Sequence, residues 1–231
     1  MIMKKLIIIT IASFTVLFAS CHKTEEPIRF SILGDSYSTF QNHVDPNSND
    51  VWPYYENIHV TDVSQMWWWQ LVDSTGWQLE KNNSFSGSLI CNLDYQGYYG
   101  AHSFLRRMDD LGNPDYIFIF GGTNDVWAEA PLGDFVFGSW TEEQLCTFRP
   151  AVACLLSSMK ERYRRAKLYF MVDLSLDDGY VAAIHRIADR YSVECIDLYY
   201  VDKDWNHPTI AGQTIIAQQV MEALLLDGVI F

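Results

Sequence analysis

Short strand-like runs alternate with longer helical segments along most of this chain, and few folds accommodate that order. We predict strands over residues 29–33, 78–83, 116–120, 168–172 and 193–198. We predict helices over residues 63–74, 104–111, 142–165, 180–191 and 209–226. Strands connected by helices, and apolar on both faces, are typical of a parallel sheet covered on two sides. The order therefore predicts one α/β domain with a five-stranded parallel sheet.

The N-terminal residues have the pattern of an export signal. Lys4 and Lys5 precede an uncharged apolar stretch over residues 6–19, which is too short to span a bilayer comfortably but suits a signal peptide. Small residues then lead directly into Cys21, an arrangement that resembles a bacterial lipoprotein lipobox. In such a lipobox the cysteine becomes the acylated first residue of the mature chain. Ordinary secretory cleavage near Ala19 is the alternative interpretation.

The chain therefore divides into three parts on sequence grounds. Residues 1–20 are predicted to be a lipoprotein signal peptide, residues 21–28 a polar tether, and residues 29–231 the folded domain. Cys21 is the predicted site of lipidation, which would anchor the exported protein to a membrane of the bacterial cell envelope.

Charge and cysteine content narrow the partners further. The chain has 16 Lys and Arg against 29 Asp and Glu, a net charge of −13, which disfavours a nucleic-acid backbone as a partner. Removal of the signal would take away two lysines and no acid. Beyond Cys21 the cysteines show no CxxC spacing, which disfavours zinc or a redox pair. Four cysteines remain beyond Cys21. The sequence does not decide whether they form disulfides or are buried free thiols; they are Cys91, Cys146, Cys154 and Cys195.

Polar residues follow four of the predicted strands, at the edge where an open parallel sheet binds its ligands. Ser36 follows the first strand in the run GDS, and Gly87 follows the second. Asn124 follows the third in the run GGTND. Asp204 and His207 lie beyond the fifth in the run DWNH. We expect these side chains to converge on one edge of the sheet.

These residue types suit acyl transfer. Ser36 is a candidate nucleophile, and His207 is a candidate base because the pKa of histidine lies near neutral pH. Asp204 is the candidate partner for the far ring nitrogen of His207, and Asp202 competes for that role. The Ser36 and Gly87 backbone amides and the Asn124 side chain are candidate oxyanion donors.

The four blocks resemble those of the SGNH hydrolases, also called GDSL esterases and lipases. That family carries a Ser in a GDS block, a Gly in a second block, an Asn in GxND and a final DxxH block. Ser36, Gly87, Asn124 and the Asp204–His207 pair match these blocks in the family's order. The resemblance implies a flavodoxin-like three-layer α/β/α sandwich, ester hydrolysis and no metal.

Other catalytic signatures are absent from the sequence. The run GDSYS fails the GxSxG pattern, and no HExxH, P-loop or GxGxxG motif occurs. The remaining histidines form no ligand pattern, so we expect neither a metal nor another cofactor.

Aromatic residues make up 15% of the chain, and their positions suggest two uses. The tryptophan run at 67–69 lies in a predicted helix, so at least one of its rings is expected in the core. Trp127, just beyond GGTND, and Tyr37 are candidate substrate-lining residues. Trp52 and Trp140 fall in loops that could border the same site.

The sequence thus predicts an exported serine esterase whose favoured substrates are short acyl esters, with O-acetyl groups on carbohydrate as one candidate among them. A lipase, lysophospholipase or thioesterase of the same family is the alternative within the class. A non-catalytic surface binding protein is the alternative outside it, although such a module has no need of Ser36, Asn124 and His207 together.

Overall fold

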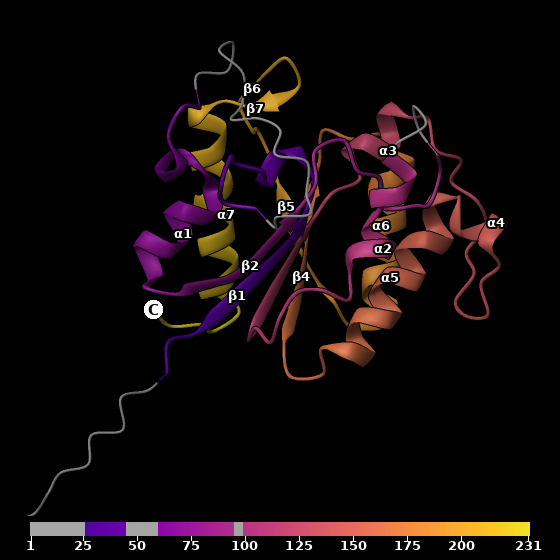
Figure 1. Cartoon of the computed structure of the whole chain (residues 1–231), viewed down its shortest axis with the longest axis horizontal. Coiled ribbons are helices and arrows are strands. Elements are labelled where there is room, and N and C mark those ends of the chain that lie inside the picture. The colour runs from indigo at the N-terminus through magenta and orange to yellow at the C-terminus, as the bar shows by residue number, and fades with distance from the viewer. Residues whose placement is uncertain (1–25, 45–59, 95–98) are drawn as a thin grey trace, which may run out of the picture.

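The computed structural model describes residues 26–44, 60–94 and 99–231. Five strands form one parallel sheet in the order β2-β1-β3-β4-β5 (Figure 1). Their bounds are β1 Arg29–Gly34, β2 Gln78–Ser84, β3 Tyr116–Phe120, β4 Lys167–Asp173 and β5 Glu194–Leu198. This is the strand order of a flavodoxin-like fold. The predicted strands and fold class are confirmed.

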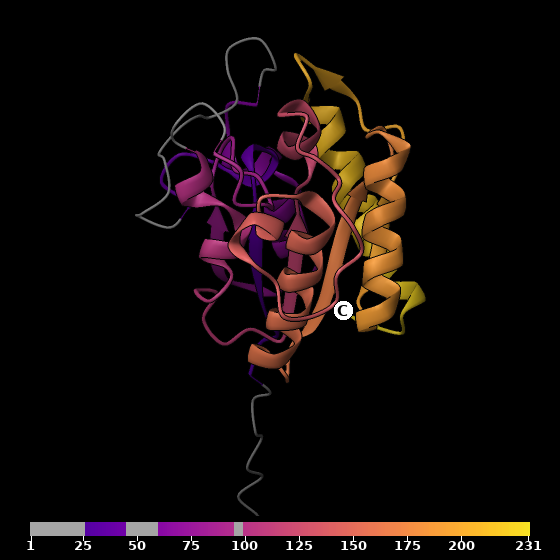
Figure 2. The ribbon, with the colours of Figure 1, turned by 90° about the vertical axis from the view of Figure 1, so that its right-hand side faces the viewer.

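Helices cover both faces of the sheet. One face packs against α1 (Trp67–Thr75) and α7 (Ile210–Leu226), and the other against a layer that contains α2, α5 and α6 (Figure 1). Figure 2 looks onto that second layer. The remaining bounds are α2 Phe104–Arg107, α3 Thr123–Trp127, α4 Glu142–Leu145, α5 Phe148–Arg162 and α6 Asp178–Tyr191.

The sheet separates two apolar cores because successive side chains of a strand point to opposite faces. On β3, Ile117 and Ile119 lie in the core beside α5 and α6, whereas Phe118 and Phe120 lie in the core beside α1 and α7. The indole rings of Trp67 and Trp68 are fully buried in the core beside α1 and α7. The structural interpretation of the tryptophan run is confirmed.

Helix α2 is much shorter than the helix predicted over residues 104–111. It ends at Arg107 because side chains, and not the next helical turn, take up the following backbone carbonyls. The Asn83 amide donates to the carbonyls of Arg107 (3.2 Å) and Asp110 (2.9 Å), and the Tyr163 hydroxyl donates to that of Met108 (3.0 Å). Local sequence could not reveal these distant partners.

Two other predicted helices are interrupted. The segment over 63–74 consists of a 3₁₀ turn at Val63–Gln65 followed by α1, because Met66 between them has an extended backbone. The segment over 142–165 divides into α4, which Thr141 caps, and α5. Pro150 lies in the first turn of α5, where its missing N–H costs no hydrogen bond.

Two short elements were not predicted, and both carry candidate site residues. Helix α3 begins directly after Gly122, whose φ of 106° favours glycine. A hairpin of β6 (Lys203–Asp204) and β7 (His207–Pro208) precedes α7. Thr209 caps α7 by accepting a hydrogen bond from Gly212 N at 3.2 Å.

Several predictions fall outside the described residues. These are the signal peptide, Cys21, most of the tether and Trp52. Within the part of the chain that the structure describes, no helix is long and apolar enough to cross a membrane. The four cysteines in that part are free thiols, which settles the question the sequence left open.

Candidate active site

Ser36 lies at the carboxyl end of β1, in a 3₁₀ turn that covers Ser36–Ser38. The turn is started by Asp35, whose Oδ1 accepts a hydrogen bond from Tyr37 N at 3.0 Å. The Ser38 hydroxyl accepts from Trp67 Nε1 at 3.1 Å, and the Ser38 carbonyl accepts from Trp68 Nε1 at 3.0 Å. The core tryptophans therefore also fix the turn that presents Ser36.

Further buried polar groups hold the same turn. Asn82 Nδ2 donates to the Ser38 carbonyl at 2.9 Å. Gln213 of α7 is fully buried; its amide nitrogen donates to the Tyr37 carbonyl at 3.3 Å, and its oxygen accepts from Trp67 N at 2.8 Å. Our sequence reasoning missed both residues. The available signal was a glutamine on the face of α7 that is otherwise small or apolar.

The structure brings the candidate nucleophile and base into direct contact. Ser36 Oγ lies 3.1 Å from His207 Nε2, although 171 residues separate them in the chain. His207 comes from β7, and the turn before it contains Trp205 and Asn206, with φ of 48° and 61°. Two left-handed residues between paired strands are typical of a tight hairpin. This hairpin carries the imidazole over the end of β1.

The far ring nitrogen does not meet the partner that the sequence suggested. His207 Nδ1 lies 3.0 Å from the backbone carbonyl oxygen of Trp205. Among the described residues, no hydrogen bond joins His207 to Asp204, whose side chain is exposed. The expected Asp204–His207 hydrogen bond was therefore wrong, because the tight turn brings its own carbonyl to Nδ1. A carbonyl oxygen can only accept, so Nδ1 carries the proton and Nε2 is left to accept one from Ser36.

The competing carboxylate has a structural role. Asp202 accepts a hydrogen bond from the Thr209 hydroxyl, and its carbonyl accepts from Thr209 N at 3.0 Å. It therefore fixes the start of α7 and not the imidazole.

Burial lowers the pKa of His207 below its usual range, and the cation of Lys203 lowers it further. The hydrogen bond to the Trp205 carbonyl opposes these effects. Lys203 is itself paired with Asp173 at the end of β4. At neutral pH the imidazole is therefore uncharged, which is the form that a general base requires.

Asn124 reaches the same edge from α3. Its Nδ2 donates to the Ser88 carbonyl at 3.1 Å and lies 3.3 Å from Asp35 Oδ2. Gly87 lies in a turn with φ of 80°, between Phe85 and Ser88, which are hydrogen-bonded to each other at 3.2 Å. Phe85 N donates to the Gly34 carbonyl at 3.1 Å. The Gly87 turn is thus joined to the end of β1 on one side and to Asn124 on the other.

Two buried carboxyl groups support these loops. Asp125 accepts hydrogen bonds from Ile90 N at 2.8 Å and Cys91 N at 3.2 Å, just beyond the Gly87 turn. Burial raises the pKa of Asp125 to about 6 and that of Asp35 to about 7. The backbone N–H groups that these carboxyl groups accept from oppose that rise.

The two candidate substrate-lining residues have different environments. Trp127 is 41% exposed, and its ring centroid lies 5.9 Å from that of His207, so this side chain borders the site. Tyr37 is only 1% exposed, and its hydroxyl donates to the Asn206 carbonyl. The expectation that Tyr37 lines a substrate cleft was wrong, because its ring packs under His207 and supports the hairpin. Trp140 packs against the core beside α5.

A surface hollow could bind a ligand, and a group of His, Cys, Asp or Glu side chains could bind a metal ion. One hollow of about 500 Å³ lies at the carboxyl ends of β4 and β5, and its lining includes Asp173 and Tyr200 but none of the candidate site residues. Another of about 560 Å³ lies at the opposite edge, around Arg162 and Arg165, and is remote from Ser36. Within the described ranges no three His, Cys, Asp or Glu side chains gather as a metal site.

Comparisons with known proteins identify the family and the fold of the chain. A profile of the GDSL-like lipase/acylhydrolase family matches residues 28–224. A GDSL-like lipase structure from Bacteroides ovatus is 40% identical, with a TM-score of 0.83, and covers 87% of this chain and 100% of its own. One from Bacteroides uniformis is 39% identical, also with a TM-score of 0.83, and covers 87% and 97%.

A more distant structure has the same fold. It is a carbohydrate esterase described as having an active site with divergent catalytic and non-catalytic binding functions. The two chains are 20% identical, with a TM-score of 0.61, over 86% of this chain and 68% of the other. No curated protein sequence matches the chain.

Proposed function

The chain belongs to the GDSL-like lipase/acylhydrolase family and is a hydrolase that acts on esters, and from that premise we propose that Ser36 is its nucleophile and His207 its general base. The observation that carries this assignment is the 3.1 Å contact between Ser36 Oγ and His207 Nε2. Both lie at the carboxyl edge of the sheet, where open α/β sheets bind their ligands.

In the first step Ser36 Oγ attacks the ester carbonyl carbon while its proton passes to His207 Nε2. The carbonyl π electrons move to the oxygen, which becomes the oxyanion of a tetrahedral intermediate. When the intermediate collapses, the proton on Nε2 passes to the leaving alcohol, and the acyl group stays on Ser36. A water molecule then attacks the acyl carbon while one of its protons passes to His207 Nε2. When this second intermediate collapses, Ser36 Oγ takes back that proton and the acid is released. The Trp205 carbonyl accepts from Nδ1–H throughout and so stabilises the imidazolium.

The oxyanion donors in this proposal are the backbone N–H groups of Ser36 and Gly87 and the amide of Asn124. Asn124 Nδ2 already donates to Ser88 and faces Asp35 at the longer distance of 3.3 Å. The longer of these two contacts, with Asp35, is the one that the oxyanion would replace. Preorganised donors of this kind typically contribute about 3 to 4 kcal/mol each to transition-state stabilisation.

For the substrate we propose short acyl esters, in particular O-acetyl groups on carbohydrate. Two exposed indole rings support this choice: Trp127 beside His207, and Trp205, which is 75% exposed on the hairpin. Exposed apolar surface beside a reactive centre often marks a binding site, and flat aromatic faces match the apolar faces of sugar rings. The fold similarity to a carbohydrate esterase is consistent with the proposal.

A substrate panel tests the proposal. Acetate release from acetylated glycans should exceed hydrolysis of p-nitrophenyl esters with long acyl chains. Trp127→Ala should raise KM for the acetylated glycan by about 5- to 10-fold, as expected for the loss of roughly 1 kcal/mol of ring contact. Phe137→Ala, which removes a half-buried ring beside α6, should leave that KM unchanged. Preference for long acyl chains would instead identify a lipase, and an unchanged KM in Trp127→Ala would exclude a sugar contact at this ring.

We also propose that the protein is held at the bacterial cell envelope by a lipid on Cys21. The support is the sequence pattern of a basic pair, an apolar stretch and small residues before the cysteine. Labelling of cells with a radioactive or clickable fatty acid should mark the wild-type protein but not Cys21→Ala. An unlabelled wild type would exclude lipidation.

A further inference from the structure

We propose that Arg107 is a positioning residue for the two backbone oxyanion donors, the N–H groups of Ser36 and Gly87, because its guanidinium hydrogen-bonds to both of the turns that carry them. This inference rests on the proposed function and adds a residue that lies outside the four sequence blocks. Arg107 is the last residue of α2, and its side chain is half-buried.

One atom of Arg107 bridges the two turns. Nη2 donates to the Gly34 carbonyl at 3.0 Å and to the Ser88 hydroxyl at 2.9 Å. Gly34 stands two residues before Ser36, and Ser88 follows Gly87 directly. The position of this nitrogen therefore limits the separation between the Ser36 turn and the Gly87 turn.

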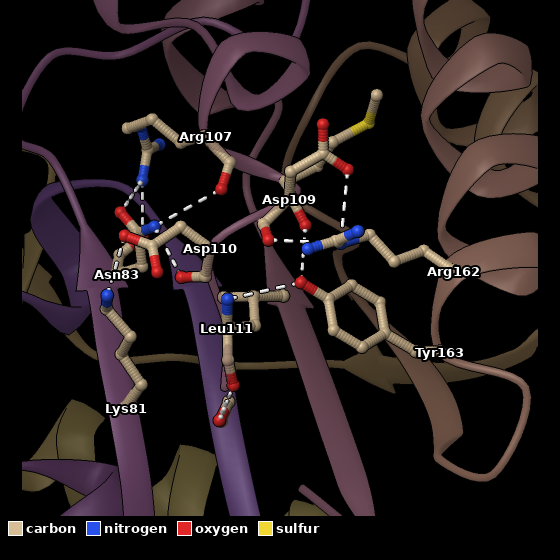
Figure 3. Close-up of polar contacts among 10 residues, drawn as sticks. Lys81, Asn83, Arg107, Asp109, Asp110, Leu111, Arg162 and Tyr163 are labelled. Carbon is tan, nitrogen blue, oxygen red and sulfur yellow. Dashed lines mark hydrogen bonds and ion pairs between the residues drawn. The ribbon is translucent and has the colours of Figure 1, made fainter. Parts of the chain in front are cut away.

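The other nitrogens of the guanidinium fix its own position. Nη1 donates to the Asn83 carbonyl and to Asn83 Oδ1, the latter at 3.1 Å, and Nε donates to the His102 carbonyl at 2.8 Å. Asn83 Nδ2 returns a hydrogen bond to the Arg107 carbonyl at 3.2 Å. Figure 3 shows the Asn83 amide between Arg107 and Asp110. The early end of α2 is thus part of the same network.

His102, whose carbonyl accepts from Arg107 Nε, also contacts a residue that precedes Gly87. It stacks on Phe85 with ring centroids 4.0 Å apart and nearly parallel planes. Phe85 N donates to the same Gly34 carbonyl that accepts from Arg107. Both lone pairs of the Gly34 carbonyl are therefore engaged, one by Phe85 N and the other by Arg107 Nη2. The peptide group at the end of β1 consequently has little freedom to rotate.

The charge of Arg107 acts on the same region. Desolvation raises the pKa of the buried Asp35 carboxyl, and the Arg107 guanidinium is one of the groups that oppose this rise. A cation beside Asp35 also offsets part of the negative potential at the place where the oxyanion forms. Position and charge can be separated by experiment, because lysine keeps the charge but cannot reproduce the planar fork of five N–H donors.

The test compares Arg107→Lys with the wild type on p-nitrophenyl acetate, with rates expressed per active site titrated by a fluorophosphonate. We expect kcat to fall by about 10- to 100-fold, the typical cost of donors displaced by about 1 Å, while KM changes less than about threefold. A boronic acid that forms a tetrahedral adduct on Ser36 should bind more weakly by a similar factor. A purely structural role would lower Tm or the number of titrated sites without changing either quantity per site.

Two further variants make the result decisive. Arg162→Lys alters an arginine in the neighbouring network, where it contacts Asp109 (Figure 3), and should leave kcat unchanged. Ser88→Ala removes a single acceptor of Arg107 and should lower kcat by a smaller factor, about 3- to 10-fold; it serves also if Arg107→Lys fails to fold. Wild-type kcat in Ser88→Ala or in Arg107→Lys would overturn the inference. A wild type without turnover or labelling would instead overturn the proposed function.

Discussion

Replacing Ser36 by alanine is expected to lower kcat for a short acyl ester by at least about 10⁴-fold. The variant removes the protein atom that bonds to the acyl group in our mechanism, and water held near His207 is a poorer and less well placed nucleophile. The oxyanion donors and the binding surface stay in place, so a small residual rate above the uncatalysed reaction should remain. Initial rates on p-nitrophenyl acetate and labelling by a fluorophosphonate measure the effect.

The chain offers a matched control on β1, the strand that leads to Ser36. Ser31 is a fully buried serine of β1, and its hydroxyl donates to the Leu111 carbonyl at 2.8 Å. Ser31→Ala should cost about 1 kcal/mol in the free energy of unfolding and leave kcat per labelled site unchanged. Retention of more than a few per cent of wild-type kcat in Ser36→Ala would show that another group performs the attack.

Replacing His207 by alanine is expected to lower kcat by about 10⁴-fold, because Ser36 then lacks a base. In the wild type, kcat/KM should fall on the acid side as His207 gains its proton. Burial and Lys203 lower the pKa of His207, so the midpoint should lie below the usual value of about 6.5. The sign follows from the mechanism: the neutral imidazole is the active form, and a lowered pKa extends activity to lower pH. In His207→Ala this acid limb should be absent.

The matched variant for this prediction is Asp204→Asn. Because Nδ1 of His207 faces the Trp205 carbonyl, loss of the Asp204 charge should change kcat less than about threefold. Removing the acid of a Ser-His-Asp triad lowers kcat by about 10⁴-fold, so the two outcomes are well separated. A loss of that size in Asp204→Asn would restore Asp204 to the triad and contradict the assignment of the Trp205 carbonyl.

The strands were predictable because each is specified locally. A run such as 116–120 is apolar at every position, and a segment buried on both faces needs nothing else. The order of the polar blocks after these strands was equally readable, because parallel strands bring their carboxyl ends to one edge. The choice of Ser36, Gly87, Asn124 and His207 rests on that rule together with the chemistry of these residues and the order of the four blocks. Helix ends were less predictable, as α2 shows, because the Asn83 and Tyr163 side chains that end it come from distant parts of the chain.

The sequence by itself therefore determined the α/β class, because apolar periodicity is a short-range property. It also determined which candidate residues meet at the carboxyl edge of the sheet, because their positions directly after strands can be read locally. Only the tertiary structure decided how His207 is held and what supports Ser36. Every residue has a backbone carbonyl, so the residue types could not show that the carbonyl of Trp205 would face His207 Nδ1. The DxxH spacing pointed to Asp204 instead. Arg107 and Gln213 act through hydrogen bonds to segments 73 and 176 residues away. Such contacts depend on where the folded chain brings distant backbone groups, which no local pattern encodes.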